Sequence, residues 1–555
     1  MSLDTLSTKA FTVRTLVACG MLAPARPDKL ARALKAIKDW GPTLAAGYTA
    51  SAIRYPQDVS IIDERGALTF AEMHRRTNAL AHALSDDGIV EGDSVAILCR
   101  NHRGFVEAAV ACSKLGVHAL FLNTAFAGPQ IAVVCEREQP HAIVYDEEFA
   151  ALVAGAVKDR RRYLAWSDSG TAPAGTELLE ALVERGDRSD VVVPAAKGRI
   201  VILTSGTTGT PKGANRKQPA SLDPVAGLVA KIPLKARERT LIAAPLFHAW
   251  GLAQLILAVG LSSTVVLRRR FEPEDTLRAI DEHGVTALVV VPVMLQRILE
   301  LGPTAVRRYD SGSLRVIATS GSALPGALAT KVMDAFGDIL YNLYGSTEVA
   351  WATIATPADL RAAPGTAGRP PRGTVVRLYG ADERQVGPGE TGRIFVGNEL
   401  CFEGYTGGGG KAVIDGLMSS GDVGHFDAGG RLFVDGRDDE MIVSGGENVF
   451  PREVEDAIAT LAGVAEVAAI GVEDADFGQR LSAYVVRSEG ATVTEEDVKQ
   501  HVKANLARYK VPRDVVFRDE LPRNATGKIL KGELAQLPDQ SAHAPPPDQP
   551  AQAQR

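Results

Sequence analysis

Short apolar runs alternate with helix-like patterns along much of the chain. The alternation starts with a strand-like run at 94–99 and a helix-like segment at 104–115. Further strand-like runs lie at 119–122, 142–145, 200–203, 241–244, 264–267, 288–291 and 316–318. Regular alternation of this kind is typical of a parallel sheet with helices on both faces. We therefore predict an α/β fold in which a large N-terminal domain contains two doubly wound α/β subdomains.

The pattern changes towards the C-terminal end of the chain. Short alternating runs between glycine-rich turns at 373–434 predict a small β-barrel subdomain. The residues that follow mix helical and strand patterns, which predicts a small α+β C-terminal domain. We place an N-terminal extension at 1–50, the large domain at 51–437, the small domain at 438–537 and a disordered tail, rich in Pro, Gln and Ala, at 538–555.

Composition excludes several classes of protein. The net charge of −6 argues against nucleic acid as a partner, because phosphate binding needs a basic surface. The five cysteines form no CxxC pair, so we predict neither a disulfide framework nor a zinc site. No signal peptide is evident, and the longest apolar stretch, 252–267, is too short and interrupted to span a bilayer. These features indicate a cytoplasmic protein.

The first forty residues are locally basic. Asp28 is a candidate N-cap for a helix with Leu30, Leu34 and Ile37 on one face. Two interpretations remain open: a helix packed on the large domain, or an amphipathic helix that rests on an anionic membrane. The basic residues are Lys9, Arg14, Arg26, Lys29, Arg32, Lys35 and Lys38.

The most informative segment is 204–213, which reads TSGTTGTPKG directly after a predicted strand. Glycine lets the backbone approach a ligand closely, and its amides can point at oxygen atoms. Lysine adds a compact positive charge. The segment matches neither the GxxxxGK[ST] nor the GxGxxG pattern. We interpret it as a loop that binds a polyphosphate.

This segment closely resembles the signature of the adenylate-forming superfamily, the AMP-dependent synthetases and ligases that include fatty acyl-CoA synthetases and luciferases. Five more segments resemble motifs of that superfamily in the expected order: 344–348, 420–422, 436–439, 444–448 and 522–528. The resemblance extends from about residue 63 to residue 534. Six motifs in order are far more specific than any one of them.

The resemblance implies a nucleotide site with a magnesium ion. Tyr344 is expected to stack on adenine, Asp422 to accept hydrogen bonds from the ribose, and Thr347 to donate to a phosphate. Glu348 is the expected magnesium ligand, since magnesium is usually held by one or two carboxylates and phosphate oxygens. The implied ATP and AMP contacts are Thr204, Ser205, Gly206, Thr207, Thr208, Gly209, Lys212, Gly321, Ser322, Ala323, Tyr344, Gly345, Asp422 and Arg437.

Three residues of the small domain or its border have implied roles in catalysis. Lys528 would reach both the carboxylate and the α-phosphate, so that a fixed cation meets the developing charge. Asp439 matches the hinge position about which the small domain rotates between the two half-reactions. Gly446 would line the path of the pantetheine thiol.

The acyl pocket is implied to contain His248, Trp250, Gly251 and Gly345. His248 would orient the carboxylate or gate the channel. In acetate-using relatives a bulky aromatic residue closes the pocket near Gly345, so glycine here argues against acetate. The apolar residues around 247–257 favour a medium- or long-chain fatty acid.

We therefore predict an ATP-dependent acid–thiol ligase. It would convert a fatty acid to acyl-AMP and transfer the acyl group to coenzyme A, giving acyl-CoA, AMP and pyrophosphate. Two alternatives remain open: a fatty acyl-AMP ligase that loads an acyl carrier protein, and a coenzyme A ligase for aromatic or other acids. Peripheral membrane contact through the N-terminal helix and a homodimer are also left open.

Overall fold

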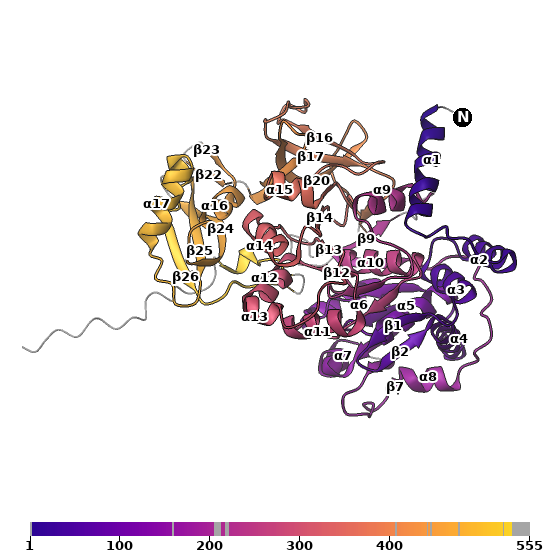
Figure 1. Cartoon of the computed structure of the whole chain (residues 1–555). Coiled ribbons are helices and arrows are strands. Elements are labelled where there is room, and N and C mark those ends of the chain that lie inside the picture. Colours follow the sequence, from indigo (N-terminus) through magenta and orange to yellow (C-terminus); the bar gives the residue numbers. More distant parts are fainter. Residues whose placement is uncertain are drawn as a thin grey trace, which may run out of the picture.

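The computed structural model describes most of the chain, and Figure 1 shows its arrangement. The described residues are 3–157, 160–204, 212–216, 221–405, 408–440, 442–444, 447–474, 478–524 and 527–534. The predicted tail at 538–555 lies outside them.

Two eight-stranded sheets form the large domain. Most neighbouring strands pair in parallel. The first sheet ends in the antiparallel strands β2 and β15, and in the second sheet β9 pairs antiparallel with β8 and β18. In order, the first sheet is β15 (Thr353–Ala355), β14 (Leu340–Tyr344), β13 (Val316–Thr319), β12 (Ala287–Val290), β10 (Arg239–Ile242), β11 (Thr264–Val266), β1 (Val59–Asp63) and β2 (Gly66–Thr69). The second is β18 (Phe402–Tyr405), β9 (Lys212–Arg216), β8 (Ile200–Thr204), β4 (His118–Phe121), β3 (Ser94–Leu98), β5 (Ala142–Asp146), β6 (Arg161–Trp166) and β7 (Glu177–Leu178).

Helices connect and cover these sheets, as the alternating pattern predicted. One large hydrophobic core joins the two sheets and the helices between them. The helices are α4 (Phe70–Asp86), α5 (Arg103–Leu115), α6 (Gly128–Glu138), α7 (Ala150–Ala156), α8 (Leu179–Arg185), α9 (Asp223–Lys231), α10 (Ala249–Gly260), α11 (Pro273–His283), α12 (Pro292–Glu300), α13 (Gly302–Val306), α14 (Gly326–Phe336) and α15 (Pro357–Ala362). Strands β1 and β2, which the sequence did not indicate, extend the first sheet through parallel pairing of β1 with β11.

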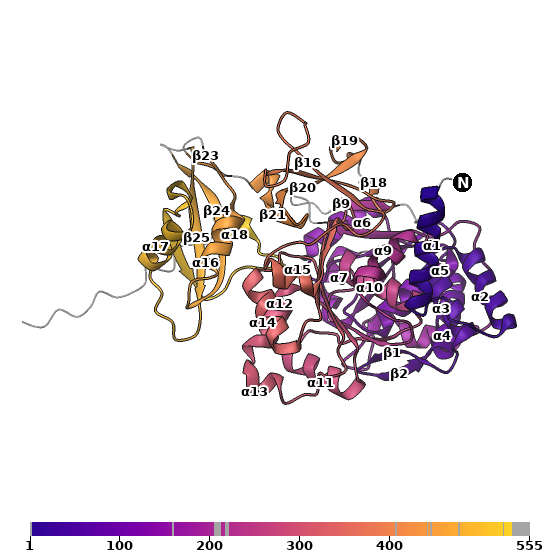
Figure 2. The ribbon, with the colours of Figure 1, turned by 45° about the horizontal axis from the view of Figure 1, so that its top comes forward.

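The two remaining sheets are small. The β subdomain is an antiparallel sheet of β16 (Val375–Tyr379), β17 (Gly392–Gly397), β20 (Leu417–Phe426) and β19 (Val413–Ile414), with β21 (Leu432–Arg437) on β20. The C-terminal domain contains β23 (Glu447–Val449), β22 (Ile442–Ser444), β25 (Gly478–Arg487), β24 (Val464–Asp474) and β26 (Asp514–Arg518), with α16 (Pro451–Ile458), α17 (Glu495–Asn505) and α18 (Lys531–Leu534). Figure 2 shows this domain as a separate body beside the large one.

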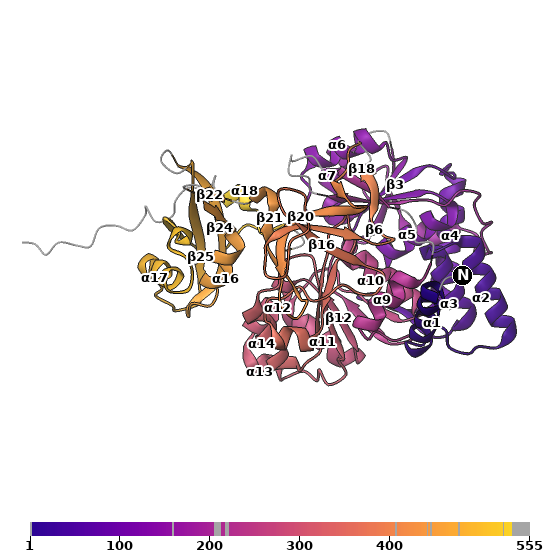
Figure 3. The same cartoon turned by 90° about the horizontal axis from the view of Figure 1, so that it is seen from above.

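Three N-terminal helices lie on the side of the large domain opposite the C-terminal domain (Figure 3). They are α1 (Leu3–Ala18), which the sequence did not indicate, α2 (Pro27–Trp40) and α3 (Leu44–Arg54). The prediction that Asp28 is the N-cap of α2 is wrong. The helix begins with Pro27, whose fixed φ suits the first helical position, so Arg26 is the N-cap and Asp28 lies in the first turn.

The apolar stripe of α2 is about half exposed, and its residues also line the large cavity described below. The helix packs through Ala33, Ala36 and Trp40, whereas Leu30, Leu34 and Ile37 are 41%, 54% and 48% exposed. Elsewhere, none of the five cysteines, all of which the structure describes, forms a disulfide, and four of them are buried, as expected of core residues. Among the described residues, no helix has the length and apolar character needed to span a membrane.

Candidate functional site

A cavity of about 1920 Å³ extends from the N-terminal helices α2 and α3 across the large domain to the β subdomain and the small domain. Residues of α10, β14 and β20 line it from one side, and Arg523 and Lys528 of the small domain line it from the other. The residues predicted for the nucleotide site and for the acyl pocket therefore line one cavity. We call the part around Tyr344, Asp422 and Glu348 the nucleotide half and the part around His248 and Trp250 the acyl half.

The nucleotide half is held together by hydrogen bonds. The Tyr344 hydroxyl, at the end of β14, donates to Asp422 Oδ2 at 2.5 Å and to Ser420 Oγ at 3.1 Å. Strands β20 and β21 place Asp422 opposite Arg437, and the two form an ion pair at 3.7 Å. Burial raises the pKa of the Asp422 carboxyl and raises that of Tyr344 strongly, although Arg437 opposes both changes. Tyrosine and aspartate are thus fixed before any nucleotide binds.

Glu348 lies beside this group, just after β14. Its Oε1 accepts a hydrogen bond from the Tyr405 hydroxyl at 2.8 Å, and its backbone N–H donates to Ser346 Oγ at 3.2 Å. Both Thr347 and Glu348 line the cavity. A single oriented carboxylate beside the expected phosphates fits what magnesium requires. Tyr405 was not predicted from the sequence, because it lies on β18, 57 residues after Glu348.

The lysine loop of the small domain reaches the same cavity. Asn524 Oδ1 accepts a hydrogen bond from the Lys528 backbone N–H at 2.9 Å and so closes the loop. Gly527 has φ +77°, and a Cβ there would lie 2.4 Å from Val293 Cγ1 of α12, so glycine is required where the loop meets the large domain. The Lys528 charge acts to lower the pKa of Asp422. The predicted catalytic lysine and the ribose-binding aspartate therefore lie near each other.

The acyl half begins at His248, the N-cap of α10. Burial lowers the pKa of His248 to about 4, and its Nε2 has no hydrogen-bond partner. Two residues further on, Trp250 Nε1 donates to the Val290 backbone oxygen at 3.0 Å, which fixes the orientation of the indole. His248, Trp250 and Gly251 all line the cavity, as predicted. His248 is a neutral imidazole near pH 7.

The structure corrects the argument drawn from Gly345. A Cβ at this position would lie 2.0 Å from the Ala350 backbone oxygen and 2.7 Å from Trp351 Cα. Glycine is therefore required by the close approach of the chain, whatever the size of the acid. Gly345 does line the cavity, but its identity says nothing about the length of the substrate.

The apolar run at 247–257, from which a long fatty acid was predicted, divides between the core and the wall of the cavity. Phe247 and Leu255 are 4% and 0% exposed and belong to the large core rather than to the wall of the cavity. Gln254 and Asn342, by contrast, line the cavity, and each has a buried polar atom without a partner, Nε2 and Oδ1. The other apolar residues of the run do line the cavity: Ala249, Leu252, Ala253, Ile256 and Leu257. The wall beyond His248 is therefore mainly apolar with a few polar groups, which fits an alkyl chain and an aromatic ring equally well.

Several predicted residues follow strand ends. Gly321, Ser322 and Ala323 follow β13 and line the cavity. Thr204 and Lys212 end and begin the paired strands β8 and β9. Asp439 lies in a single 3-10 turn, Asp438–Glu440, directly after β21. Outside the described residues are Ser205, Gly206, Thr207, Thr208, Gly209 and Gly446.

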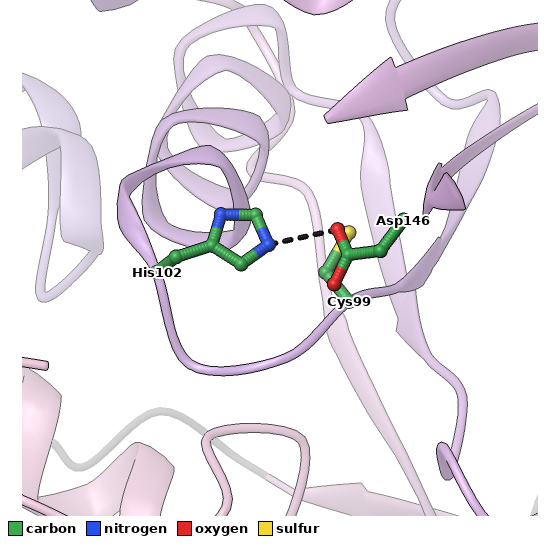
Figure 4. A group of neighbouring side chains, drawn as sticks. All are labelled: Cys99, His102 and Asp146. Atoms are coloured by element: carbon green, nitrogen blue, oxygen red, sulfur yellow. Dashed lines mark hydrogen bonds and ion pairs between the residues drawn. The ribbon is translucent and has the colours of Figure 1, made fainter. Parts of the chain in front are cut away.

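A second cluster, Cys99, His102 and Asp146, has the residue types of a metal site but not the chemistry (Figure 4). His102 Nε2 contacts Asp146 Oδ1 at 2.8 Å, and His102 Nδ1 accepts from the Gly104 N–H at 3.0 Å, so both ring nitrogens are used. Burial and Asp146 raise the pKa of the Cys99 thiol strongly, and a protonated thiol is a poor ligand. The cluster instead caps α5 and joins it to the ends of β3 and β5.

Comparison with known proteins settles the family. The AMP-binding enzyme model matches residues 48–406, and the AMP-binding enzyme C-terminal domain model matches residues 453–528. The chain belongs to the AMP-binding enzyme family. It is 35% identical over 495 residues to an indoleacetate–CoA ligase of Aromatoleum aromaticum, covering 88% of this chain and 95% of the relative. It is 34% identical to a feruloyl-CoA synthase of an Amycolatopsis species, covering 84% and 93%.

The fold agrees with solved structures of the family. The o-succinylbenzoate coenzyme A synthetase from Bacillus subtilis, in complex with its acyl-adenylate intermediate, superposes with a TM-score of 0.77 at 28% identity, covering 89% of this chain and 98% of that one. The same enzyme is known in complex with ATP and a magnesium ion. As a member of this family, the protein is an AMP-forming acid–thiol ligase that activates a carboxylic acid with ATP.

Proposed function

We propose that the protein makes the coenzyme A thioester of an aromatic acid through an aryl-acyl-adenylate. The observation that carries this proposal is the wall formed by Trp250. Its N–H is bonded to Val290, which fixes the indole, and Trp250 lines the cavity two residues after His248. An aromatic acid can stack against such a face, an arrangement worth about 0.5–1.5 kcal/mol beyond the area it buries. The relatives named for indoleacetate and ferulate support the same class of acid.

In this proposal each half of the cavity has its own task. Tyr344 and Asp422 bind adenine and ribose, and Glu348 with Thr347 holds the phosphates and a magnesium ion, which would neutralise phosphate charge. Lys528 stabilises the charge that develops between the carboxylate and the α-phosphate. His248 is neutral, so it orients the carboxylate without adding a positive charge. After adenylation the small domain rotates about Asp439 and lets the thiol of coenzyme A approach.

The test is pyrophosphate release across a panel of acids, with and without coenzyme A, with mass detection of the products. The panel pairs indole-3-acetate and hydroxycinnamates with octanoate and palmitate. Release that depends on the aromatic acids, with their coenzyme A thioesters as products, supports the proposal. A preference for octanoate or palmitate would overturn it in favour of a fatty acyl-CoA synthetase. Adenylate that accumulates without a thioester would indicate an enzyme that loads a carrier protein.

The exposed stripe of α2 supports a second proposal, peripheral contact with an anionic membrane. Leu30 and Leu34 are one turn apart, and Arg26 and Lys38 continue the same four-residue spacing at either end. An apolar stripe flanked by basic side chains fits a bilayer with anionic headgroups. A symmetric dimer through this stripe is disfavoured, because it would bring the same basic groups together.

Vesicle co-sedimentation tests this second proposal. The protein should sediment with anionic vesicles and much less with neutral ones, and a Leu30→Ser, Leu34→Ser variant should lose the effect. Val90→Ser, which changes an apolar residue 55% exposed elsewhere, is the control. Equal binding by the double variant would contradict the proposal. Light scattering of the same samples would show whether the protein is a homodimer.

A further inference from the structure

Helix α12 of the large domain meets the small domain at two points. Gln296 Nε2 on α12 donates a hydrogen bond to Glu466 Oε1 on β24 at 3.4 Å, and both residues line the cavity. Val293, three residues earlier and therefore on the same face of the helix, lies against Gly527, where a Cβ would come within 2.4 Å of Val293 Cγ1. One face of α12 thus receives a polar and an apolar contact from the small domain.

The other oxygen of the Glu466 carboxylate is bound within the small domain. Glu466 Oε2 forms an ion pair with Arg523 Nη2 at 2.9 Å, and the two side chains are 20% and 19% exposed. Arg523 Nη1 in turn donates to the Gly527 backbone oxygen at 2.6 Å, directly before Lys528. A pair with so little exposure is screened less by salt than a surface pair. One carboxylate therefore joins α12 to the residues that hold the backbone beside Lys528.

Only one of these contacts crosses between the domains. Glu466 and Arg523 both follow the proposed hinge at Asp439, so a rotation there would move them together and separate them from Gln296. A contact that exists in one of two arrangements stabilises that arrangement alone and shifts the equilibrium towards it. Gln296 Nε2 also donates to Glu300 Oε1 on its own helix at 3.0 Å, so it keeps a partner when the small domain moves away.

We propose that Gln296 and Glu466 are positioning residues that hold Lys528 at the cavity for adenylation, and we call their contact the latch. This inference rests on the rotation about Asp439 in the proposed function and adds the contact that stabilises one of the two arrangements. A single, partly exposed hydrogen bond contributes little free energy, so the latch can open in every catalytic cycle. Its two residues act on the reaction through the position of Lys528.

The experiment measures the single-turnover rates of adenylation and of thioester formation from a prepared adenylate, with any acid that the enzyme uses. Each rate scales with the fraction of enzyme in the matching arrangement, so the ratio of the two rates reports the equilibrium between them. Gln296→Glu places a second carboxylate against Glu466, and the ratio of adenylation to thioester formation should fall about threefold or more. Gln296→Lys places the opposite charge there and should raise the ratio by a similar factor. Gln500→Glu, the same change beside Glu496 on α17, should leave the ratio unchanged.

Two further measurements separate the latch from a structural role and from the proposed function. A residue needed only for folding would lower both rates together, and an unchanged ratio would overturn the inference. In a Glu466→Gln background the changes at Gln296 should lose most of their effect, because the charge on which they act is gone. Effects that persist there would also overturn it. If Asp439→Pro separates the two steps while the Gln296 variants do not, the latch alone is wrong. If Asp439→Pro also fails to separate them, the rotation is wrong as well.

Discussion

The two halves of the cavity treat their polar groups in opposite ways. In the nucleotide half, Tyr344, Ser420, Asp422 and Arg437 are bonded to one another before a ligand arrives. In the acyl half, His248, Gln254 and Asn342 each have a buried polar atom with no partner. The nucleotide is the same in every member of the family, so its site can be complete in advance. The acid differs between members, so we expect the polar atoms of the acyl half to find their partners only when an acid binds.

The largest expected effect comes from the lysine that faces both halves. Lys528→Ala should slow adenylation about 10²–10³-fold, the usual cost of losing one preorganised charge-stabilising group. Thioester formation from an adenylate prepared in advance should largely survive. The measurement is pyrophosphate exchange for the first step and thioester release for the second, with Lys499→Ala on α17 as the control. Equal loss in both half-reactions would show that the lysine acts outside adenylation.

The second prediction separates the two steps by the hinge. Asp439→Pro restricts φ where the backbone must change between the two domain arrangements. The variant should still form the adenylate, because this structure already has Lys528 at the cavity. It should lose most of its thioester formation, seen as adenylate that accumulates in the presence of coenzyme A. Unchanged thioester formation would place the hinge elsewhere.

The third prediction tests whether the nucleotide half is independent of the acid. Asp422→Asn weakens hydrogen bonds to a charged group, so the KM for ATP should rise about 10- to 100-fold. The rise should be the same for every acid that the enzyme uses. Asp415→Asn, at an exposed turn next to β20, serves as the matched control. A KM for ATP that rose by different factors with different acids would contradict the independence of the nucleotide half.

The smallest effect concerns stability and pH. His248 has a pKa of about 4 in the folded protein and about 6.5 when unfolded. Between these values the unfolded chain binds more protons, so this group costs stability as the pH falls from about 6.5 to 4. Between pH 6.5 and 4 the unfolding temperature of His248→Gln should therefore fall less than that of the wild type, by a few degrees at most. Exposed His141→Gln should follow the wild type, and an identical slope for His248→Gln would contradict the prediction.

The difference between the halves also explains what the sequence could predict. The parallel strands and most helices followed from the period of their apolar residues, and Asp422, Arg437 and Lys528 followed from motifs that are local in sequence. Tyr405 and Asn342 could not be found in this way, since only the fold brings them to the cavity. Gln254 did leave a signal, as a polar residue in an apolar helix. The size of the acid could not be predicted from Gly345, because close approach to the backbone of Ala350 determines the identity of this residue.

The pairing of β20 with β21 determines which residues would move when the small domain rotates. Arg437 is held opposite Asp422 within a sheet, two residues before the proposed hinge at Asp439. A rotation at Asp439 would carry away everything that follows it, Lys528 included, and would leave this pair where it stands. The acyl-adenylate would then stay bound through its ribose while Lys528, which helps to form it, moves away. The enzyme could exchange one reaction environment for another without ever releasing what it has made.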